Sequence, residues 1–597
     1  MNQHKLSLYL QLPCGVWIDD DQLVVIFESD TTGWKILWFD GDILVDEIAF
    51  TKEECYGNRY VKLIDREHYA GYSYIFMNEK GRTPDSHATK YQIDNAYGVR
   101  RSINEYKALI NDSSFDWEED TAPRLEYKDV IAYLIHVRGF TVHISSDTKH
   151  PGTFEAVCEK ISYLKELGVN TIELQPAYEF QEYLFAECND GLPSSEKMNY
   201  WGYKEGYYFA PKCSYSATND PAAAFKTMVK ALHKHGIEIV MQFYFPKTVK
   251  RSDICYVLRY WVTEYHVDGF HLKGAELPIR EIAENTLLKD VKIWYEYPDA
   301  ALAHSSKCTL RNGVWAEYKD SFLFALRRFL NNQPDSMQDF LFQMRFLPAF
   351  YGKINYITNY YGMTLHDMVT YNEKCNVPNG EENRDGMDDC ATWNCGYEGE
   401  DAPEDVRCLR LMQMKNAVLM LMLSQGVPLL FMGDEIGNTQ FGNNNPYCHD
   451  DLTTWLNWSR MEEYKELYSF IKCVIQYRKE NAIFHLGRNL CDTAYGEAFC
   501  PELSYVYEET TDGKPRDNVV GIHYFFESKA YLVVMNMCPV NKVLPLLTYR
   551  CKEKTDLRSD WQTIICTGSE PSIRPDGKSV LLMPHTIAVL ERNYDIT

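Results

Sequence analysis

Residues 237–273 read IEIVMQFYFPKTVKRSDICYVLRYWVTEYHVDGFHLK, and this stretch decides the fold. The run IEIVMQF at its start and the run GFHLK near its end are apolar, and the segment SDICYVLRYWVTEY between them has the periodicity of an amphipathic helix. A strand buried on both faces is typically a continuous apolar run, and parallel neighbours need a crossover connection, which is usually a helix. The stretch therefore predicts one strand–helix–strand unit of a parallel sheet.

The same alternation extends outward in both directions. Eight strand-like runs occur in order, and they are IAYLIHV, TIELQP, IEIVMQF, GFHLK, KIWYEY, VWAEY, KINYITN and PLLFMGD. Helical segments such as FEAVCEKISYLKELG and VRCLRLMQMKNAVLMLMLSQG lie between them. Eight such units favour a closed (β/α)8 barrel over an open doubly wound sheet.

Short β-prone runs with Gly, Asp and Asn punctuation flank the barrel, among them QLVVIFES before it and KAYLVVMNM after it. This pattern is typical of antiparallel β-sandwiches. We therefore predict a multidomain α/β chain with an N-terminal sandwich over 1–115, the barrel over 116–488 and a C-terminal sandwich over 489–597. In the first sandwich, Trp34, Trp38 and Tyr60 could form a sugar platform or belong to the core.

Composition limits the partners. The chain has 61 basic and 85 acidic residues, and its formal charge of −24 disfavours nucleic acid and anionic membranes. Neutral carbohydrate suits a chain with 43 Tyr and 12 Trp, although most of these rings belong to the core. The 18 Cys lack metal-ligand spacing, and no run of eighteen apolar residues occurs. We expect reduced thiols, no metal, no cofactor and a cytoplasmic protein.

Six motifs resemble the isoamylase and glycogen-debranching branch of glycoside hydrolase family 13, the α-amylase superfamily. They fall in family order as HVRGF (136–140), ELQP (173–176), NYWGY (199–203), HVDGF (266–270), NGEENRDG (379–386) and SQGVPLLFMGDE (424–435). The resemblance implies a starch-binding-like N-terminal sandwich, a catalytic barrel, a C-terminal sandwich and an α-glucan ligand.

Retaining glycosidases need two carboxyl groups about 5 to 5.5 Å apart, and barrel enzymes place them at the carboxyl ends of strands. By the resemblance, the family nucleophile on the fourth strand corresponds to Lys273, and the third carboxylate, after the seventh strand, corresponds to Tyr361. Only Glu296, at the position of the general acid on the fifth strand, is retained. An ammonium cannot attack an anomeric carbon, so the resemblance implies a barrel that has lost hydrolysis.

Two further polar positions are also changed. Gln242 stands where the family has Asp on the third strand, and His271 stands where it has Arg on the fourth. Only 31 residue steps separate Gln242 from Lys273, so the family's long excursion there is missing. With Lys273 in place of a carboxylate, we expect an ion pair between Lys273 and Glu296 that favours the ionised Glu, the wrong state for an acid.

Aromatic residues could still hold a sugar. Trp201 and Tyr203 match positions where the family presents aromatics to the first subsite, and Tyr360 and Tyr361 would face the same cavity. With Gln242 and His271 they are the predicted substrate-binding residues. Alternatively, Tyr360 and Tyr361 fill the volume that a lost substrate once occupied.

Other acidic residues near strand ends are interpreted as structural, because a charge near a barrel rim is more often part of a hydrogen-bond network than a catalyst. These residues are Asp268, Glu276, Glu317 and Asp434. The adjacent His366 and Asp367 resemble a catalytic pair, but the register set by Thr364, Leu365 and Asn372 places His366 at a family Arg.

Three functions remain open at this stage. The first is a catalytically degenerate protein of α-glucan metabolism that binds glucan without hydrolysing it. The second is an active glycoside hydrolase that uses Glu296 and an unrecognised partner. The third is a protein-interaction scaffold, for which neither sugar nor catalysis matters.

Overall fold

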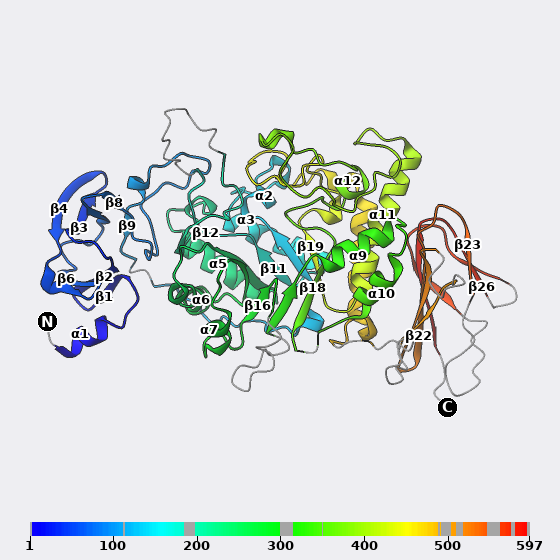
Figure 1. Ribbon diagram of the computed structural model, residues 1–597, viewed down its shortest axis with the longest axis horizontal. Helices are drawn as coiled ribbons and strands as arrows, with labels where there is room; N and C mark the ends of the chain where they lie inside the picture. The colour runs from blue at the N-terminus through cyan, green and yellow to red at the C-terminus, as the bar shows by residue number, and fades with distance from the viewer. Residues whose placement is uncertain are drawn as a thin grey trace.

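The computed structural model describes residues 3–111, 114–183, 197–298, 314–348, 350–487, 490, 503–508, 517–545, 561–574 and 579–593. A barrel lies at the centre of an elongated molecule, with one β-sandwich at each end (Figure 1). This is the multidomain architecture that the sequence predicted.

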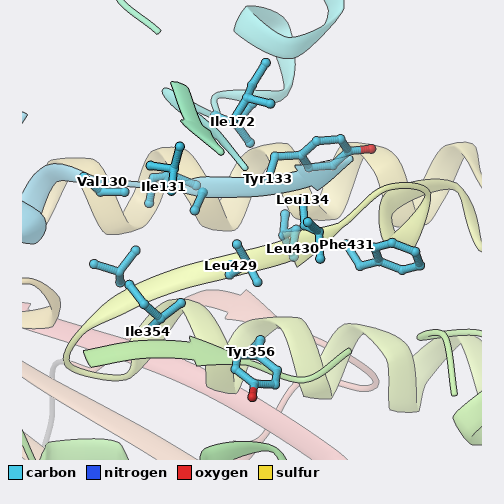
Figure 2. Close-up of a cluster of buried hydrophobic side chains, with 14 of the residues drawn as sticks. Val130, Ile131, Tyr133, Leu134, Ile172, Ile354, Tyr356, Leu429, Leu430 and Phe431 are labelled. Atoms are coloured by element: carbon cyan, nitrogen blue, oxygen red, sulfur yellow. The ribbon is translucent and has the colours of Figure 1, made fainter. Parts of the chain in front are cut away.

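The eight predicted runs form the eight strands of a closed parallel barrel, each paired with the next and the last with the first. The strands are β10 (Ala132–Ile135), β11 (Thr171–Leu174), β14 (Glu238–Phe245), β15 (Gly269–Gly274), β16 (Lys292–Tyr295), β17 (Trp315–Tyr318), β18 (Gly352–Tyr356) and β19 (Val427–Phe431). Most of their residues are buried, as a strand covered on both faces requires. Figure 2 shows this packing where β10, β18 and β19 meet.

Helices surround the barrel. They include α2 (Val137–Thr141), α3 (Phe154–Glu159), α4 (Ile161–Leu167), α5 (Pro221–Lys234), α6 (Arg251–Tyr265), α7 (Ile279–Glu284), α9 (Ser321–Leu330), α10 (Met337–Arg345), α11 (Glu404–Leu423), α12 (Arg460–Glu463) and α13 (Lys465–Glu480). The segment predicted as one helix over 154–168 is two helices, because Lys160 leaves helical geometry at φ −93° and ψ 1°. Helix α6 fills most of the short connection between β14 and β15.

Two sheets form the N-terminal sandwich, preceded by α1 (Gln3–Tyr9). One sheet contains β1 (Gly15–Asp19), β2 (Gln22–Glu28), β6 (Arg59–Asp65) and β5 (Cys55–Tyr56), and the other contains β4 (Ile43–Ala49), β3 (Lys35–Asp40), β7 (Ser73–Asn78) and β8 (Gly81–Thr83). Trp38 is fully buried and Tyr60 stacks on Phe27 with ring centres 4.7 Å apart. These two rings are therefore core, and Trp34 packs against the same core while remaining partly exposed.

The C-terminal sandwich also has two sheets. The larger contains β20 (Leu503–Val506), β21 (Val519–Phe526), β22 (Lys529–Asn536), β27 (Thr586–Asn593) and β24 (Gln562–Cys566), and the smaller contains β23 (Lys542–Pro545), β26 (Ser579–Leu582) and β25 (Ser572–Ile573). On β27, Ile587 and Val589 join the barrel core, whereas Ala588 and Leu590 join the sandwich core. This alternation follows from the two-residue period of a strand and attaches the sandwich to the barrel.

Within the described segments, no helix is long and apolar enough to span a lipid bilayer. The cysteines in the same segments are all unpaired thiols.

Candidate functional site

A cavity of about 400 Å³ lies where β15, β16 and β17 end. The carboxyl ends of parallel strands meet at one rim, which is where barrel enzymes carry their sites. Eight tyrosines contribute to its lining, and they are Tyr203, Tyr244, Tyr295, Tyr297, Tyr318, Tyr356, Tyr360 and Tyr361. The other charged or imidazole-bearing residues in the lining are His271, Lys273, Glu296, Lys319 and Asp320.

Lys273 lies on β15 among tyrosine rings. Its Nζ is 5.2 Å from the ring centre of Tyr360, 5.8 Å from that of Tyr318 and 6.0 Å from that of Tyr361. Such cation–π contacts contribute about 0.5 to 2 kcal/mol each, more where water is excluded. The next residue, Gly274, is the last of β15, and it has a φ of +124° at a place where a Cβ would collide with the backbone of Phe245.

The predicted ion pair between Lys273 and Glu296 is not formed, although both side chains are described. Glu296 follows β16 and its side chain is exposed at the rim, so water already solvates its charge. The Lys273 ammonium instead faces three π systems within the cavity. This prediction was wrong because sequence position places both groups at the same rim but does not set the direction of either side chain.

Glu173, on β11, accepts hydrogen bonds from polar side chains of two other barrel strands. Its Oε1 accepts hydrogen bonds from Gln242 Nε2 at 2.6 Å and from His271 Nδ1 at 2.5 Å. All three residues are almost completely buried. Tyr203 donates its hydroxyl to Gln242 Oε1, which completes a chain from the cavity wall to the barrel interior. Gln242 is therefore held within the protein, and it does not line the cavity.

Burial lowers the pKa of His271 to about 4, and the nearby charge of Lys273 lowers it further, against the opposing effect of Glu173. The imidazole is therefore neutral at physiological pH. Since its Nδ1 faces a carboxylate oxygen, that nitrogen carries the proton.

Tyr361, which the motif resemblance assigns to the third carboxylate, donates its hydroxyl to Asp320 Oδ1 at 2.8 Å. Tyr356 donates to the same oxygen at 2.7 Å. Burial, with Asp320 as the next cause, raises the pKa of Tyr361 well above its usual value, so it stays a neutral phenol. Glu296 and Asp320 are thus the carboxylates of the cavity lining, and Asp320 was not predicted from the sequence.

The predicted aromatic residues form one cluster. The ring centre of Tyr360 lies 5.0 Å from that of Trp201 and 5.2 Å from that of Tyr203. Tyr203, Tyr360 and Tyr361 line the cavity, whereas Trp201 packs edge to face against Tyr360 and is not part of the lining. Tyr295 and Tyr297 were missed, although both lie next to Glu296 in the run KIWYEYP.

The four acidic residues interpreted as structural lie outside the cavity lining. Asp268 Oδ2 accepts from the backbone of Ile239. Glu276 pairs with Lys247 at 3.3 Å and Glu317 with Lys319 at 2.5 Å. Asp434 accepts the hydroxyl of Thr358 and the backbone N–H of Phe431.

Two adjacent buried carboxyl groups follow β19. Burial raises the pKa of Asp434 to about 6 and that of Glu435 to about 7, against hydrogen bonds that oppose each shift. Glu435 accepts the hydroxyls of Tyr133 and Tyr163, while its Oε2 has no hydrogen-bond partner in the described part of the chain.

We expect Glu435→Gln to flatten the pH dependence of stability. The folded protein holds the Glu435 proton that the unfolded chain releases above a pKa of 4.5, so wild-type stability falls as pH rises from there through about 7. A pKa difference of this size corresponds to roughly 3 kcal/mol. Urea unfolding at pH 5 and pH 8 measures the effect, and exposed Glu462→Gln is the control. Parallel pH profiles for wild type and Glu435→Gln would contradict the assignment.

Comparisons with known proteins agree on one family, although no family model matches the chain. Isoamylase 1, chloroplastic, of Oryza sativa subsp. japonica is 34% identical over 459 residues, covering 62% of this chain and 56% of the relative. The glycogen operon protein GlgX homolog of Haemophilus influenzae is 31% identical over 451 residues, covering 63% of this chain and 67% of the relative. The match spans 56–59% of the length of three plant isoamylases.

Solved structures agree on the fold. The catalytic module of the multi-modular glycogen-degrading pneumococcal virulence factor SpuA has a TM-score of 0.74 at 17% identity, covering 98% of this chain and 97% of that chain. The GBS pullulanase SAP in complex with maltotetraose has a TM-score of 0.72 at 18% identity, covering 98% and 88%.

A closed parallel barrel between two β-sandwiches, with a cavity at the strand ends, defines a (β/α)8-barrel protein with its candidate site at the carboxyl rim. The chain belongs to the isoamylase and glycogen-debranching branch of glycoside hydrolase family 13.

Proposed function

We propose that this protein is a catalytically degenerate member of its family, which acts in α-glucan metabolism by binding α-glucan without hydrolysing it. The observation that carries the proposal is the ammonium group of Lys273 among tyrosine rings, at the position of the family nucleophile. A cation below a developing oxocarbenium ion raises the barrier by charge repulsion and offers no oxygen for a covalent intermediate.

The surrounding polar groups support the loss of hydrolysis. Gln242 and His271 both donate to Glu173, and Tyr361 donates to Asp320. Each of these side chains already donates a hydrogen bond to a carboxylate of the protein. Glu296 remains, exposed at the rim and without an ion pair to Lys273.

Glucan binding is supported by the character of the cavity and by the relatives. Tyrosine rings present flat apolar faces and hydroxyl groups, which suit the faces and hydroxyls of a sugar. One structure of similar fold holds maltotetraose, and another is of a glycogen-degrading protein. By the same resemblance, the N-terminal sandwich is a second place for glucan contact.

We expect Tyr297→Ala to weaken glucan binding. The side chain of Tyr297 is 60% exposed at the cavity rim, so its loss costs little stability but removes an aromatic face from the ligand. Affinity electrophoresis through gels containing glycogen should show wild-type retardation and a dissociation constant raised about tenfold in the variant, which is about 1.4 kcal/mol.

Tyr397→Ala is the matched control for this experiment, because Tyr397 is similarly exposed, at 41%, and lies outside the cavity lining. Equal retardation of all three proteins would move the binding site away from the barrel. A wild-type protein that is not retarded would contradict the proposed function and favour a protein-interaction scaffold.

A second candidate is an active glycoside hydrolase that works through Glu296. The observation in its favour is Asp320, a second carboxylate in the lining of the same cavity. Against it, the hydroxyls of Tyr356 and Tyr361 both donate to Asp320 Oδ1, so both lone pairs of that oxygen are already used within the protein.

A further inference from the structure

We propose that His366, Asp367 and Glu400 form a binding site for a divalent transition-metal ion of the zinc class. The motif register argued against His366 and Asp367 as a catalytic pair, and no sequence motif pointed to Glu400. The proposal does not depend on the glucan function. His366 and Asp367 lie at the start of the turn η6 (Asp367–Val369), after the seventh barrel strand, and Glu400 precedes α11. The turn and the α11 end are thus brought together at this point.

The three donor atoms already have the spacing of a metal site. His366 Nδ1 lies 3.5 Å from Asp367 Oδ1 and 3.5 Å from Glu400 Oε1. All three donor atoms lie within 4.8 Å of one another. Zinc binds imidazole nitrogen and carboxylate oxygen at about 2.0 to 2.2 Å, so two ligands in a tetrahedral site are roughly 3.4 Å apart.

An unpartnered nitrogen points into this cluster. His366 is 3% exposed, and its Nδ1 has no hydrogen-bond partner within the described part of the chain. A buried polar atom without a partner costs about 1 to 3 kcal/mol, and coordination to a metal would remove that cost. The two carboxylates are too far from this nitrogen, or too poorly aligned, to accept a hydrogen bond from it.

Asp367 is held in position for such a role. Its Oδ1 accepts the Thr439 hydroxyl at 2.5 Å, and its Oδ2 accepts the backbone N–H of Gln440 at 2.8 Å and that of Gly442 at 3.4 Å. Hydrogen bonds of this kind orient metal ligands and strengthen their sites. Oδ1, the oxygen that faces His366, accepts only the Thr439 hydroxyl among the described residues and therefore keeps a lone pair for a metal ion.

Glu400 leaves the site open to solvent. Its side chain is 36% exposed, so an ion could enter from its side and keep a water molecule as fourth ligand. Two arginines hold the segment around Glu400. Arg460 lies 4.0 Å from Glu400 Oε2, the oxygen that does not face His366, and Arg410 donates to the carbonyls of Gly399 and Tyr397. Because His366 and Asp367 lie in the turn after the seventh strand and Glu400 precedes α11, a bound ion would link these two segments.

The test is metal uptake by the full chain after removal of metal with a chelator. Zn²⁺ titrated in competition with a chromophoric chelator should bind wild type at one ion per chain and raise its Tm. His366→Gln should abolish this binding, and Glu400→Gln should weaken it at least ~10-fold. Exposed His235→Gln is the matched control and should bind as wild type does.

Cysteines could also bind zinc, so Co²⁺ is the second probe. A site of nitrogen and oxygen ligands gives weak visible bands without the intense thiolate charge-transfer absorption of a cysteine site. No uptake by wild type, equal uptake by wild type and His366→Gln, or a thiolate band would each overturn the proposal. If His366→Gln does not fold, the partly exposed Glu400→Gln decides the test.

Discussion

Purified protein incubated with a branched α-glucan is expected to release no new reducing ends, even at high protein concentration and over long times. The reason is Lys273, which the motif resemblance assigns to the position of the family nucleophile and whose ammonium lies 5.2 Å from the Tyr360 ring centre. Loss of the nucleophile in a hydrolase costs on the order of 10⁶ in kcat. Measurement of reducing ends in a purified preparation checks the prediction.

Glu296→Gln is the control that makes the assay decisive. A trace of contaminating hydrolase would act equally in the wild-type and variant preparations. Turnover that Glu296→Gln abolishes would instead mean that Glu296 has a working partner, and Asp320→Asn would then be the next variant, since Asp320 lines the same cavity. That result would favour the active hydrolase over the degenerate protein.

Lys212→Met is expected to destabilise the fold by about 3 to 5 kcal/mol. Lys212 follows β13 (Tyr207–Pro211), and its Nζ lies 2.8 Å from Glu179 Oε1 and 2.8 Å from Glu182 Oε1. The side chains of all three residues are at most 1% exposed. Methionine fills a similar volume but leaves buried Glu179 without its cation and Glu182 with Arg101 alone, and the cost of an uncompensated buried charge is large.

Urea unfolding at neutral pH measures this effect. Lys472→Met is the matched control, because Lys472 also pairs with a glutamate, Glu166, but their side chains are 33% and 60% exposed. An exposed pair contributes at most about 1 kcal/mol. Equal decreases in the free energy of unfolding in the two variants would show that burial does not set the strength of the Lys212 interactions.

The destabilisation caused by Lys212→Met should extend beyond the loop that contains Lys212. Glu182 also lies 3.4 Å from Arg101 Nη1, and Arg101 follows β8 of the N-terminal sandwich. Arg101 and Lys212 therefore meet at one carboxylate, which links the sandwich to the barrel. We expect the sandwich and the barrel to unfold at lower urea concentration together in the variant.

The sequence alone predicted the barrel and its two flanking sandwiches. Strands buried on both faces must be apolar throughout, so the eight barrel strands appear in the sequence as eight apolar runs, such as IEIVMQF for β14. The motif register also placed Lys273, Tyr361 and Glu296 at strand ends, because a residue that follows a parallel strand lies at the carboxyl rim of the barrel.

Only the tertiary structure decided which groups interact at that rim. Lys273 contacts tyrosine rings from β17 and from the segment after β18 rather than Glu296, and Glu173 gathers Gln242 and His271 from two other strands. His366 and Glu400 meet although they are far apart in the chain. The polarity of each residue by itself indicates whether its side chain will be buried, so the sequence determines the core. The partner of a polar group depends on side-chain direction and on competition among all groups within reach, which exist only once the chain has folded.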